Sequence, residues 1–439
     1  MTAFAGAAPA RIRLAKAAAN ALAAMAIKAG GALLAIAVFT LAARRMAPDD
    51  FGHLAIAFNA ISFLAVVAVL GQETLIARSF GEYAARGQLG LARAAHRFGW
   101  RATLLSGAVF ALAFAALAPL AGVARDGALA AGAAFLLMQA LLHYSSHATR
   151  AIAGFAASEA NRELTWRIVL LAGLAVAAQR QAPSETVFFS AAAAGMALSL
   201  ALQALATRRA LIGAPIAAPA GAERAEWLRR SRAMWLSAVV EAASQYADVV
   251  LVGYFATPAA AGGYFAATRI ANVFAMVSAG LHAYSVGQCA RLFFSGEARR
   301  LQEILNAIAV VAMALLAPAL ALALYFGPQA LAIFGARFAA DYPTLAILAG
   351  ANFCVALCGP AAGILLTTGH ERLYARLVAA ATPVRLGLSA VLAAKYGALG
   401  AAIGWAAVSA PMALGLAALC RRLCGVDPSV TGLWRAARR

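Results

Sequence analysis

Nine stretches of this chain contain no Asp, Glu, Lys or Arg over 20 or more consecutive residues. A helix needs about 20 mostly apolar residues to cross the roughly 30 Å of hydrocarbon in a bilayer. Apolar residues make up 64% of the 439 positions and charged residues 12%, against about 45–50% and about 25% in globular proteins. So few charges cannot cover a water-exposed surface, and most of the chain must therefore lie in lipid. The stretches are 51–72, 102–124, 127–149, 186–207, 249–268, 270–290, 304–336, 342–370 and 396–420.

Four further spans become visible when isolated charges are allowed within an apolar run. The pattern predicts an all-α polytopic membrane protein with about twelve transmembrane helices. The apolar run after Lys16 continues into a full span, which favours a retained helix over a cleaved signal. The predicted helices are 19–43, 52–72, 98–120, 128–148, 164–180, 186–207, 233–256, 264–290, 304–326, 342–367, 374–394 and 397–419.

The basic residues test this count independently, because cytoplasmic loops of membrane proteins are enriched in Lys and Arg. With a cytoplasmic N-terminus, 27 of the 36 basic residues fall on the inner side, seven on the outer side and two within the membrane. One missed helix would destroy this asymmetry. The net charge of +19 is thus spread between apolar runs, whereas a nucleic-acid-binding protein concentrates it in one patch. We therefore expect no nucleic-acid partner.

The same topology divides the chain into two lobes and three surface segments. The basic residues at both ends of the chain are expected to lie on anionic lipid headgroups. The predicted segments are a cytoplasmic amphipathic N-terminus at 1–18, an N-lobe of helices one to six at 19–207, a cytoplasmic linker at 208–231, a C-lobe of helices seven to twelve at 232–420 and a cytoplasmic basic tail at 421–439.

Two outer turns share one motif. The turn after the first helix contains Pro48 and Gly52, and the turn after the seventh contains Pro258 and Gly262, so Pro-x-x-x-Gly recurs after 210 residues. Six spans separate the two turns, and both copies therefore have the same orientation in the membrane. This is the pattern of parallel repeats related by an axis along the membrane normal. We expect two pseudo-symmetric six-helix lobes.

Four polar residues follow one face of the predicted seventh helix. Glu241, Ser244, Gln245 and Asp248 have the spacing i, i+3, i+4, i+7, which places them on the same side of an α-helix. Ionisable residues inside a membrane cost at least a few kcal/mol, so they mark functional sites. We expect this stripe to face a wet cavity, and its carboxylates suit the binding of H⁺ or Na⁺ as a coupling ion.

Lys28 is the charged residue of the predicted first helix, and it precedes Gly30 and Gly31, which can loosen that helix. The offset of 210 residues places Lys28 and Glu241 at similar depth. We therefore predict that helices one and seven face each other across a central cavity, with Lys28 near Glu241 or Asp248.

Two further cations accompany Lys28. Arg385 lies at the middle of the predicted eleventh helix, and Arg269 lies at the outer end of the eighth. Lys28, Arg385 and Arg269 could supply the positive charge that a diphosphate headgroup requires. The alternative is that the intramembrane charges form internal ion pairs, which only fix helix packing. No catalytic residue is predicted.

Cysteine and histidine residues do not indicate a metal site. The two C-x3-C pairs lie in or beside apolar runs without carboxylates or His at ligand spacing, so we interpret the cysteines as small hydrophobic residues. Gln139, His143 and His147 form a stripe on the fourth helix, for which hydrogen bonding between helices is the expected use. The cysteines are Cys289, Cys354, Cys358, Cys420 and Cys424.

Several segments, in the same order along the chain, resemble those of Wzx-type polysaccharide and O-antigen flippases of the multidrug/oligosaccharidyl-lipid/polysaccharide superfamily. The resemblance covers most of the chain, and the order of the segments makes it specific. The segments are Arg44-Arg45-Met46-Ala47-Pro48-Asp49-Asp50-Phe51-Gly52, the stretch 248–269, Phe334-Gly335-Ala336-Arg337-Phe338 before Asp341-Tyr342-Pro343, Thr368-Gly369-His370-Glu371-Arg372, and Tyr396-Gly397-Ala398-Leu399-Gly400-Ala401-Ala402.

The resemblance implies two lobes around a V-shaped central cavity and alternating access by rocking of the lobes. The implied cargo is an undecaprenyl-diphosphate-linked oligosaccharide, flipped from the inner to the outer leaflet of the bacterial inner membrane for O-antigen or exopolysaccharide synthesis. A polysaccharide polymerase and a chain-length regulator are the expected protein partners. Cavities of this family are often cationic, whereas the seventh helix here is acidic. Ion coupling is therefore the expected role of that helix.

Two other functions remain open from the sequence. A multidrug or toxin antiporter of the same superfamily would export cations, which suits an acidic seventh helix. A membrane glycosyltransferase or polymerase would need a catalytic loop, and Asp49-Asp50 in the first outer turn is the candidate. That turn is short, and its repeat has Ala259-Ala260 in place of both acids, so an enzyme is the weaker interpretation.

Overall fold

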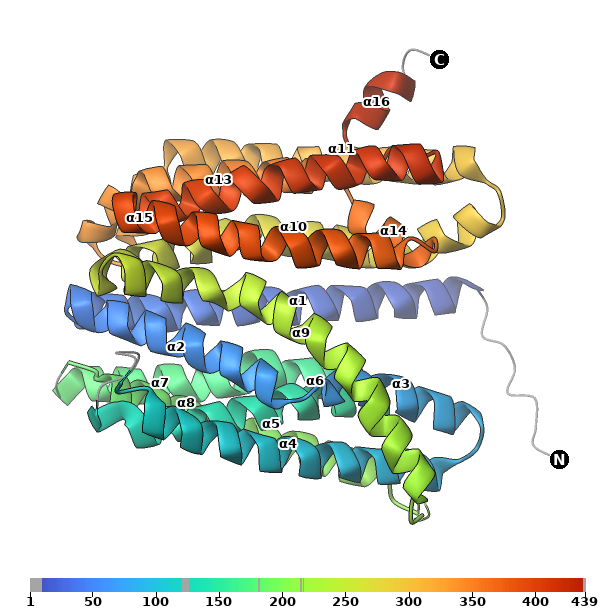
Figure 1. Ribbon diagram of the computed structural model, residues 1–439, viewed down its shortest axis with the longest axis horizontal. Helices are drawn as coiled ribbons and strands as arrows, with labels where there is room; N and C mark the ends of the chain where they lie inside the picture. The colour runs from blue at the N-terminus through green and yellow to red at the C-terminus, as the bar shows by residue number, and fades with distance from the viewer. Residues whose placement is uncertain (1–9, 121–125, 181, 214, 216, 437–439) are drawn as a thin grey trace. The chain divides into compact units, whose positions relative to one another are not determined.

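The structure is a computed structural model that describes residues 10–120, 126–180, 182–213, 215 and 217–436. Within this part of the chain, ten helices are long and apolar enough to cross a membrane (Figure 1). One of them, α15, contains two helices joined at Gly397, whose φ of 60° and ψ of −138° are not helical. One further span consists of α7 and the short helices before it, because α7 alone has only 15 residues. The structure therefore confirms about twelve transmembrane helices.

The helices coincide closely with the predicted spans, because helix length in lipid is set by apolar length. The elements are α1 (Ala10–Arg45), α2 (Pro48–Ala68), α3 (Gln72–Ala85), α4 (Leu89–Leu117), the 3-10 turn η1 (Asp126–Ala128), α5 (Leu129–Ala153), α6 (Phe155–Ala160), the π-helix η2 (Asn161–Thr165), α7 (Trp166–Arg180), α8 (Glu185–Ala210), α9 (Gly221–Phe255), α10 (Pro258–Phe294), α11 (Ala298–Tyr325), α12 (Gly327–Ala332), the 3-10 turn η3 (Ala336–Asp341), α13 (Tyr342–Leu357), α14 (Ala361–Thr367), α15 (Glu371–Cys424) and α16 (Thr431–Ala436).

The chain divides into two compact units, which are described separately. Unit 1 comprises Met1–Met46 and Ile61–Ala242, and unit 2 comprises Ala47–Ala60 and Ala243–Arg439. This division differs from the predicted lobe boundaries. The beginning of α2 belongs to unit 2, and α9 already begins within the predicted linker and stays in unit 1 as far as Ala242. Both α2 and α9 therefore belong partly to each unit. Residues 1–9 of the predicted surface segment at 1–18 lie outside the described residues, and residues 10–18 belong to α1.

Unit 1 packs around α5, which contacts α3, α4 and α8. Tyr144 of α5 is fully buried and lies so close to Gly99 of α4 that a Cβ there would come within 2.5 Å of the tyrosine Oη. Trp227, near the beginning of α9, is buried in the same cluster, and its Nε1 donates a hydrogen bond to the Tyr83 hydroxyl at 3.0 Å. This anchor explains why the predicted linker is partly a helix of unit 1.

Unit 2 contains the two repeated outer turns, and they pack against each other. A Cβ on Gly52 would lie 1.9 Å from the carbonyl oxygen of Pro258, and Gly262 lies against the Phe51 ring. The Phe51 ring makes edge contacts with Phe265 and Phe338, at centroid distances of 6.1 Å and 5.6 Å. The glycines of the repeated motif are therefore positions of close backbone approach, where no side chain fits. This contact places the first residues of α2 in unit 2.

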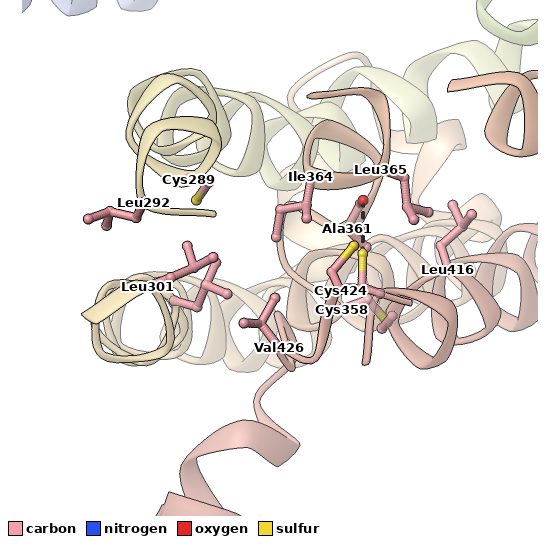
Figure 2. Close-up of a cluster of buried hydrophobic side chains, with 13 residues drawn as sticks. Cys289, Leu292, Leu301, Cys358, Ala361, Ile364, Leu365, Leu416, Cys424 and Val426 are labelled. Carbon is pink, nitrogen blue, oxygen red and sulfur yellow. Dashed lines mark hydrogen bonds between the residues drawn. The ribbon is translucent and has the colours of Figure 1, made fainter. Parts of the chain in front are cut away.

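The inner cluster of unit 2 joins α10, α11, α14 and α15, and four of the five cysteines lie in it (Figure 2). Cys358, Cys420 and Cys424 are buried among Leu, Ile and Ala side chains, and all are reduced. The Cys420 thiol donates to the carbonyl oxygen of Ala361 at 3.3 Å. The interpretation of these cysteines as small hydrophobic residues is confirmed. Among the described residues no group of His, Cys, Asp or Glu could hold a metal ion.

The predicted basic tail begins as the last residues of α15, and the chain that follows α15 then contacts α11. Asp427 accepts hydrogen bonds from Ser429 at 2.7 Å and from Thr431 at 3.0 Å, and these bonds stabilise the first turn of α16. The Asp427 backbone exchanges two bonds of 2.8 Å with the Gln302 side chain of α11. The beginning of the tail is therefore attached to unit 2.

Candidate functional site

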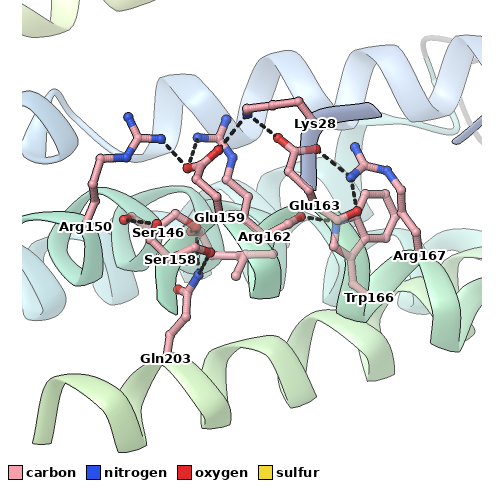
Figure 3. A network of polar contacts seen from close by, with 11 residues as sticks. Lys28, Ser146, Arg150, Ser158, Glu159, Arg162, Glu163, Trp166, Arg167 and Gln203 are labelled. Carbon is pink, nitrogen blue, oxygen red and sulfur yellow. Dashed lines mark hydrogen bonds and ion pairs between the residues drawn. The ribbon is translucent and has the colours of Figure 1, made fainter. Parts of the chain in front are cut away.

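Lys28 lies at the centre of a network of charges in unit 1 (Figure 3). Its Nζ is 2.6 Å from Glu159 Oε2 on α6 and 2.6 Å from Glu163 Oε1 on η2. Lys28 is therefore paired with two carboxylates that the sequence did not single out, and its proximity to Glu241 or Asp248 stays a prediction. The first helix packs against the segment from α6 to α7, and the carboxylates that face it come from there.

Gly30 and Gly31 allow this close packing. A Cβ on Gly31 would lie 2.9 Å from the Cβ of Glu163, and one on Gly30 would lie 3.3 Å from Leu164 Cδ2. The sequence interpretation was that these glycines loosen the helix, but α1 runs unbroken from Ala10 to Arg45. Their role is to let the backbone of α1 approach the carboxylate-bearing helix.

Three arginines complete the network, which we call the Lys28 cluster: Lys28, Arg150, Glu159, Arg162, Glu163 and Arg167. Arg150 pairs with Glu159, Arg162 lies 4.0 Å from the same carboxylate, and Arg167 lies 2.8 Å from Glu163. Four cations thus surround two carboxylates, for a formal net charge of +2.

The cations and the carboxylates of the Lys28 cluster differ in exposure. The side chains of Lys28 and Arg150 are 43% and 41% exposed, whereas Glu159 is 0% and Glu163 is 14% exposed. Arg162 is 30% exposed and Arg167 is 20% exposed. The carboxylates therefore form a floor that is buried at Glu159 and mostly buried at Glu163, and the cations cover it with part of their surface exposed. An anion could bind to these cations without displacing protein from the core.

Neutral hydrogen bonds hold the floor in place. The Ser158 hydroxyl of α6 donates to the carbonyl oxygen of Ser146 on α5 at 2.6 Å. The Gln203 amide of α8 donates to Ser146 Oγ and to the Ser158 carbonyl, each at 3.1 Å (Figure 3). Two helices, α5 and α8, thus fix α6, and Glu159 with it. The π-helix η2, which carries Glu163, is a form often found at functional sites.

The depth of the Lys28 cluster follows from the turn between α5 and α6. This turn is Gly154, whose φ of 98° few other residues adopt. Glu159 lies about 7.5 Å beyond it along the helix. Lys28, which contacts Glu159, therefore lies one to two helical turns from the turn between α5 and α6.

The predicted charges of the C-terminal half form a sealed pair in unit 2. Arg385 Nη1 of α15 donates to both oxygens of Asp248 on α9, at 2.8 Å and 2.6 Å, and Nη2 donates to the Ser244 carbonyl at 3.2 Å. The side chains are 7% and 9% exposed. The Ser244 hydroxyl lies 3.4 Å from Thr382 Oγ1. This geometry matches the alternative in which intramembrane charges fix helix packing.

The predicted polar stripe of α9 is divided by exposure. Glu241 and Gln245 are exposed, Ser244 is partly buried and Asp248 is buried. Glu241 also belongs to unit 1, whereas the other three belong to unit 2. The four residues therefore differ in exposure and in unit, and their role in ion coupling stays a prediction.

Arg269 is not at a helix end. Pro258 occupies the first turn of α10, and the Thr257 hydroxyl caps this helix by accepting a hydrogen bond from the Ala260 N–H at 3.1 Å. Helix eight thus begins before its predicted start, which places Arg269 about three turns inside it. The guanidinium lies over the Phe265 ring, 4.2 Å from its centroid.

Gln139 uses its amide as predicted, for a contact between helices: its Nε2 donates to Ser62 Oγ at 3.0 Å. The residues that the sequence did not single out are the partners of Lys28. Arg150, Arg162 and Arg167 are among the 27 basic residues that the predicted topology placed on the inner side, and Glu159 and Glu163 were not assigned a role. Two carboxylates four residues apart at the beginning of a span are the signal that could have identified them.

No protein-family model and no curated protein sequence matches this chain. Solved structures do match its fold. A multidrug resistance transporter of the MATE family, in an inward-facing conformation, has a TM-score of 0.72 at 13% identity, covering 92% of this chain and 98% of that one. The lipid II flippase MurJ, in an inward closed conformation, has a TM-score of 0.72 at 11% identity, covering 91% and 87%. A Pyrococcus furiosus transporter of the MOP superfamily, described as having a binding pocket of reversed polarity, has a TM-score of 0.63 at 14% identity, covering 92% and 94%.

These likenesses define the class of the fold. The chain is a multi-pass membrane protein with the fold of transporters and flippases of the MOP superfamily, the multidrug/oligosaccharidyl-lipid/polysaccharide superfamily. At identities of 11–14% these likenesses show the fold alone.

Proposed function

We propose that this chain is a flippase that moves an undecaprenyl-diphosphate-linked oligosaccharide from the inner to the outer leaflet of the bacterial inner membrane, for O-antigen or exopolysaccharide synthesis. The observation that carries this proposal is the Lys28 cluster, with its partly exposed cations above a buried carboxylate floor. A diphosphate is a compact anion with many acceptor oxygens, and Arg and Lys bind such groups with charge-assisted hydrogen bonds.

The floor carboxylates give the site a way to release its cargo. Without a headgroup, Glu159 and Glu163 neutralise part of the positive charge and hold the cations in place. A bound diphosphate competes with the carboxylates for Lys28 and Arg167. The diphosphate and the carboxylates can therefore replace each other on these cations with only a small net change in free energy. A cluster of unpaired cations would bind a diphosphate more tightly but would release it slowly. Exchange of this kind suits alternating access in a transporter.

The orientation, partners and coupling belong to the same proposal. Both termini are cytoplasmic, as the distribution of basic residues predicts, and the cytoplasmic end of unit 1 carries the Lys28 cluster. A polysaccharide polymerase and a chain-length regulator are the proposed partners on the far side of the membrane. Transport is coupled to H⁺ or Na⁺, and no chemical reaction is catalysed.

A multidrug cation antiporter is the second candidate, because a MATE-family transporter shares this fold. The exposed Glu241 of α9 favours it, since a carboxylate attracts a cationic drug. The net positive charge of the Lys28 cluster opposes it. A membrane glycosyltransferase is not favoured by any of the three solved structures described above.

Transport in reconstituted vesicles tests the proposal. Purified protein in liposomes should move a fluorescent diphosphate-linked sugar lipid across the bilayer, detected as fluorescence that a membrane-impermeant quencher can no longer reach. A Lys28→Gln variant should lose at least about tenfold in rate, because a charge-assisted hydrogen bond contributes about 1.5–3 kcal/mol.

The matched control is Arg86→Gln. Arg86 is also a cation of unit 1, and it pairs with Glu82 outside the Lys28 cluster, so this variant should move the lipid at the wild-type rate. Efflux of a cationic dye without movement of the sugar lipid would instead show that the chain is a drug antiporter.

A further inference from the structure

The turn between α2 and α3 in unit 1 is held tightly against α9. Leu70 has a φ of 57° and Gly71 a φ of 73°. A Cβ on Gly71 would lie 2.5 Å from the Ser231 carbonyl oxygen and 2.7 Å from the Trp235 nitrogen. The Trp235 indole N–H donates to the Val67 carbonyl at 2.8 Å. The first turn of α3 is thus fixed beside α9.

The buried face of α3 carries polar groups without partners. Gln72, Glu73 and Ser79 are all buried, and Glu73 is only 4% exposed. One oxygen of each side chain, including Glu73 Oε2, has no hydrogen-bond partner among the residues that the structure describes. A buried carboxylate is stable in its charged form only if it is paired, and otherwise it takes up a proton.

The charge that acts on Glu73 is a second carboxylate. Glu241 of α9 is exposed, and its negative charge disfavours ionisation of Glu73. Burial is the largest cause and raises the pKa of Glu73 to about 7. A hydrogen bond from its own backbone N–H, the second cause, lowers the pKa, and the charge of Glu241, the smallest of the three causes, raises it. Glu73 lies in α3, outside the membrane-spanning helices.

The other ionisable groups around α3 are engaged elsewhere or exposed. Arg230 of α9 lies 3.2 Å from Glu82 of α3 and 2.6 Å from Glu226. The Tyr144 hydroxyl of α5 donates to the His96 carbonyl of α4 and lies 3.2 Å from the His96 ring nitrogen. The remaining groups are Arg78 of α3, which is exposed, Arg97 and Arg101 of α4, which are also exposed, and His143 and His147 of α5, which lie near Arg162.

We propose that Glu73 and Glu241 form a proton-binding pair, which takes up one proton and thereby holds α3 against α9. The protonated Glu73 is neutral and can stay buried beside Glu241. When the proton leaves, two negative charges face each other and one of them is buried, so α3 and α9 are driven apart.

The location of Glu73 and Glu241 links the binding of a proton to transport. Glu241 is next to Ala242, where α9 leaves unit 1, and α9 then continues as a helix of unit 2. A proton that changes the packing of α3 on α9 therefore acts on a helix that both units share. This consequence rests on the proposed transport function. The binding of the proton itself does not, and it can be measured without substrate.

Infrared difference spectroscopy of the purified full-length protein, titrated in sodium-free buffer, tests the proposal. The wild type should lose one carboxylic acid C=O band with a midpoint near pH 7, and Glu73→Gln should abolish this loss. Glu241→Gln removes the repelling charge and should move the midpoint toward acid pH. Glu82→Gln is the control on the same helix. Its side chain is already paired with Arg230, so the titration should not change.

Unfolding temperature measured against pH provides a second readout. Because the folded state raises the pKa of Glu73, its protonation stabilises the fold at low pH, and this stability is lost as pH rises from about 4.5 to about 7. Glu73→Gln resembles the protonated form, so this pH-dependent loss should disappear.

Three outcomes would overturn the proposal. The first is a titration near pH 7 that persists in Glu73→Gln. The second is an unchanged titration midpoint in Glu241→Gln. This second measurement still tests the proposal if Glu73→Gln does not fold. The third is an equal spectral change on adding Na⁺ at constant pH, which would indicate a sodium site. Loss of lipid transport with an intact titration would count against the proposed function and leave the proton-binding pair in place.

Discussion

The Lys28 cluster of unit 1 and the Asp248–Arg385 pair of unit 2 occupy corresponding helices of the two repeats. In each unit the first helix of the repeat, α1 or α9, carries one charge that pairs with an opposite charge on the fifth, which is the segment from α6 to α7 in unit 1 and the first part of α15 in unit 2. The signs are reversed: the first helix supplies a cation in unit 1 and an anion in unit 2. The depths also differ. Lys28 lies about 25 Å before the end of α1, and Asp248 lies about 10 Å before the end of α9.

The difference in exposure separates a binding site from a packing contact. The Asp248–Arg385 pair is neutral, satisfied and sealed, whereas the Lys28 cluster has excess positive charge and open cations. One repeat architecture therefore supports two uses of an intramembrane charge. In unit 2 it orients two helices, and in unit 1 we infer that it receives a ligand.

The largest expected effect is on stability and lies in unit 2. Arg385→Met leaves Asp248 buried without its partner, which should lower the free energy of unfolding by about 3–5 kcal/mol. Thermal unfolding of the purified protein in detergent measures this loss. The double variant Arg385→Met/Asp248→Leu removes both charges and should recover most of it. If the single variant were as stable as the wild type, the pair would not be a packing contact.

The next effect concerns how α1 approaches the floor of the Lys28 cluster. Gly31→Ala places a methyl group against the Cβ of Glu163 and should cost about 1–3 kcal/mol by overpacking. Gly30→Ala is the matched control, because its new methyl group would meet the flexible end of Leu164 at 3.3 Å. It should cost less than Gly31→Ala in the same unfolding assay, and equal costs would contradict this account of the packing.

The smallest expected effect is that of substituting Arg162, the cation of the Lys28 cluster that lies farthest from its carboxylate. Arg162 lies 4.0 Å from Glu159 and is 30% exposed, so Arg162→Gln should change the free energy of unfolding by less than about 0.5 kcal/mol. Its positive charge should still contribute to anion binding, and affinity for a diphosphate lipid should fall by about two- to fivefold. A large loss of stability would mean that Arg162 is structural.

The sequence predicts the spans of this fold well and the pairing of its charges poorly. Apolar length determines where a membrane helix lies, which is why the helices match the predicted ranges. Outside the spans, α3 was not predicted, because its polar residues Gln72 and Glu73 lie on its buried face and conceal its apolar pattern.

Which helix faces Lys28 depends on packing between distant segments, and no local pattern encodes it. Placing Lys28 opposite α9 rested on the repeat offset, which relates positions by symmetry and does not establish contact. Gly30 and Gly31 indicated that another helix packs closely against α1 at this point, because small residues are typical of close contacts between membrane helices. The sequence did not specify which helix that partner is.

Equilibrium binding of undecaprenyl diphosphate, without sugar, to the purified protein tests the central claim most directly. Wild-type protein should bind this lipid, Lys28→Gln should bind it at least about tenfold more weakly, and Arg385→Met/Asp248→Leu should retain the wild-type affinity. Unchanged binding in Lys28→Gln, or loss of binding in the double variant alone, would contradict the assignment of the ligand site to unit 1.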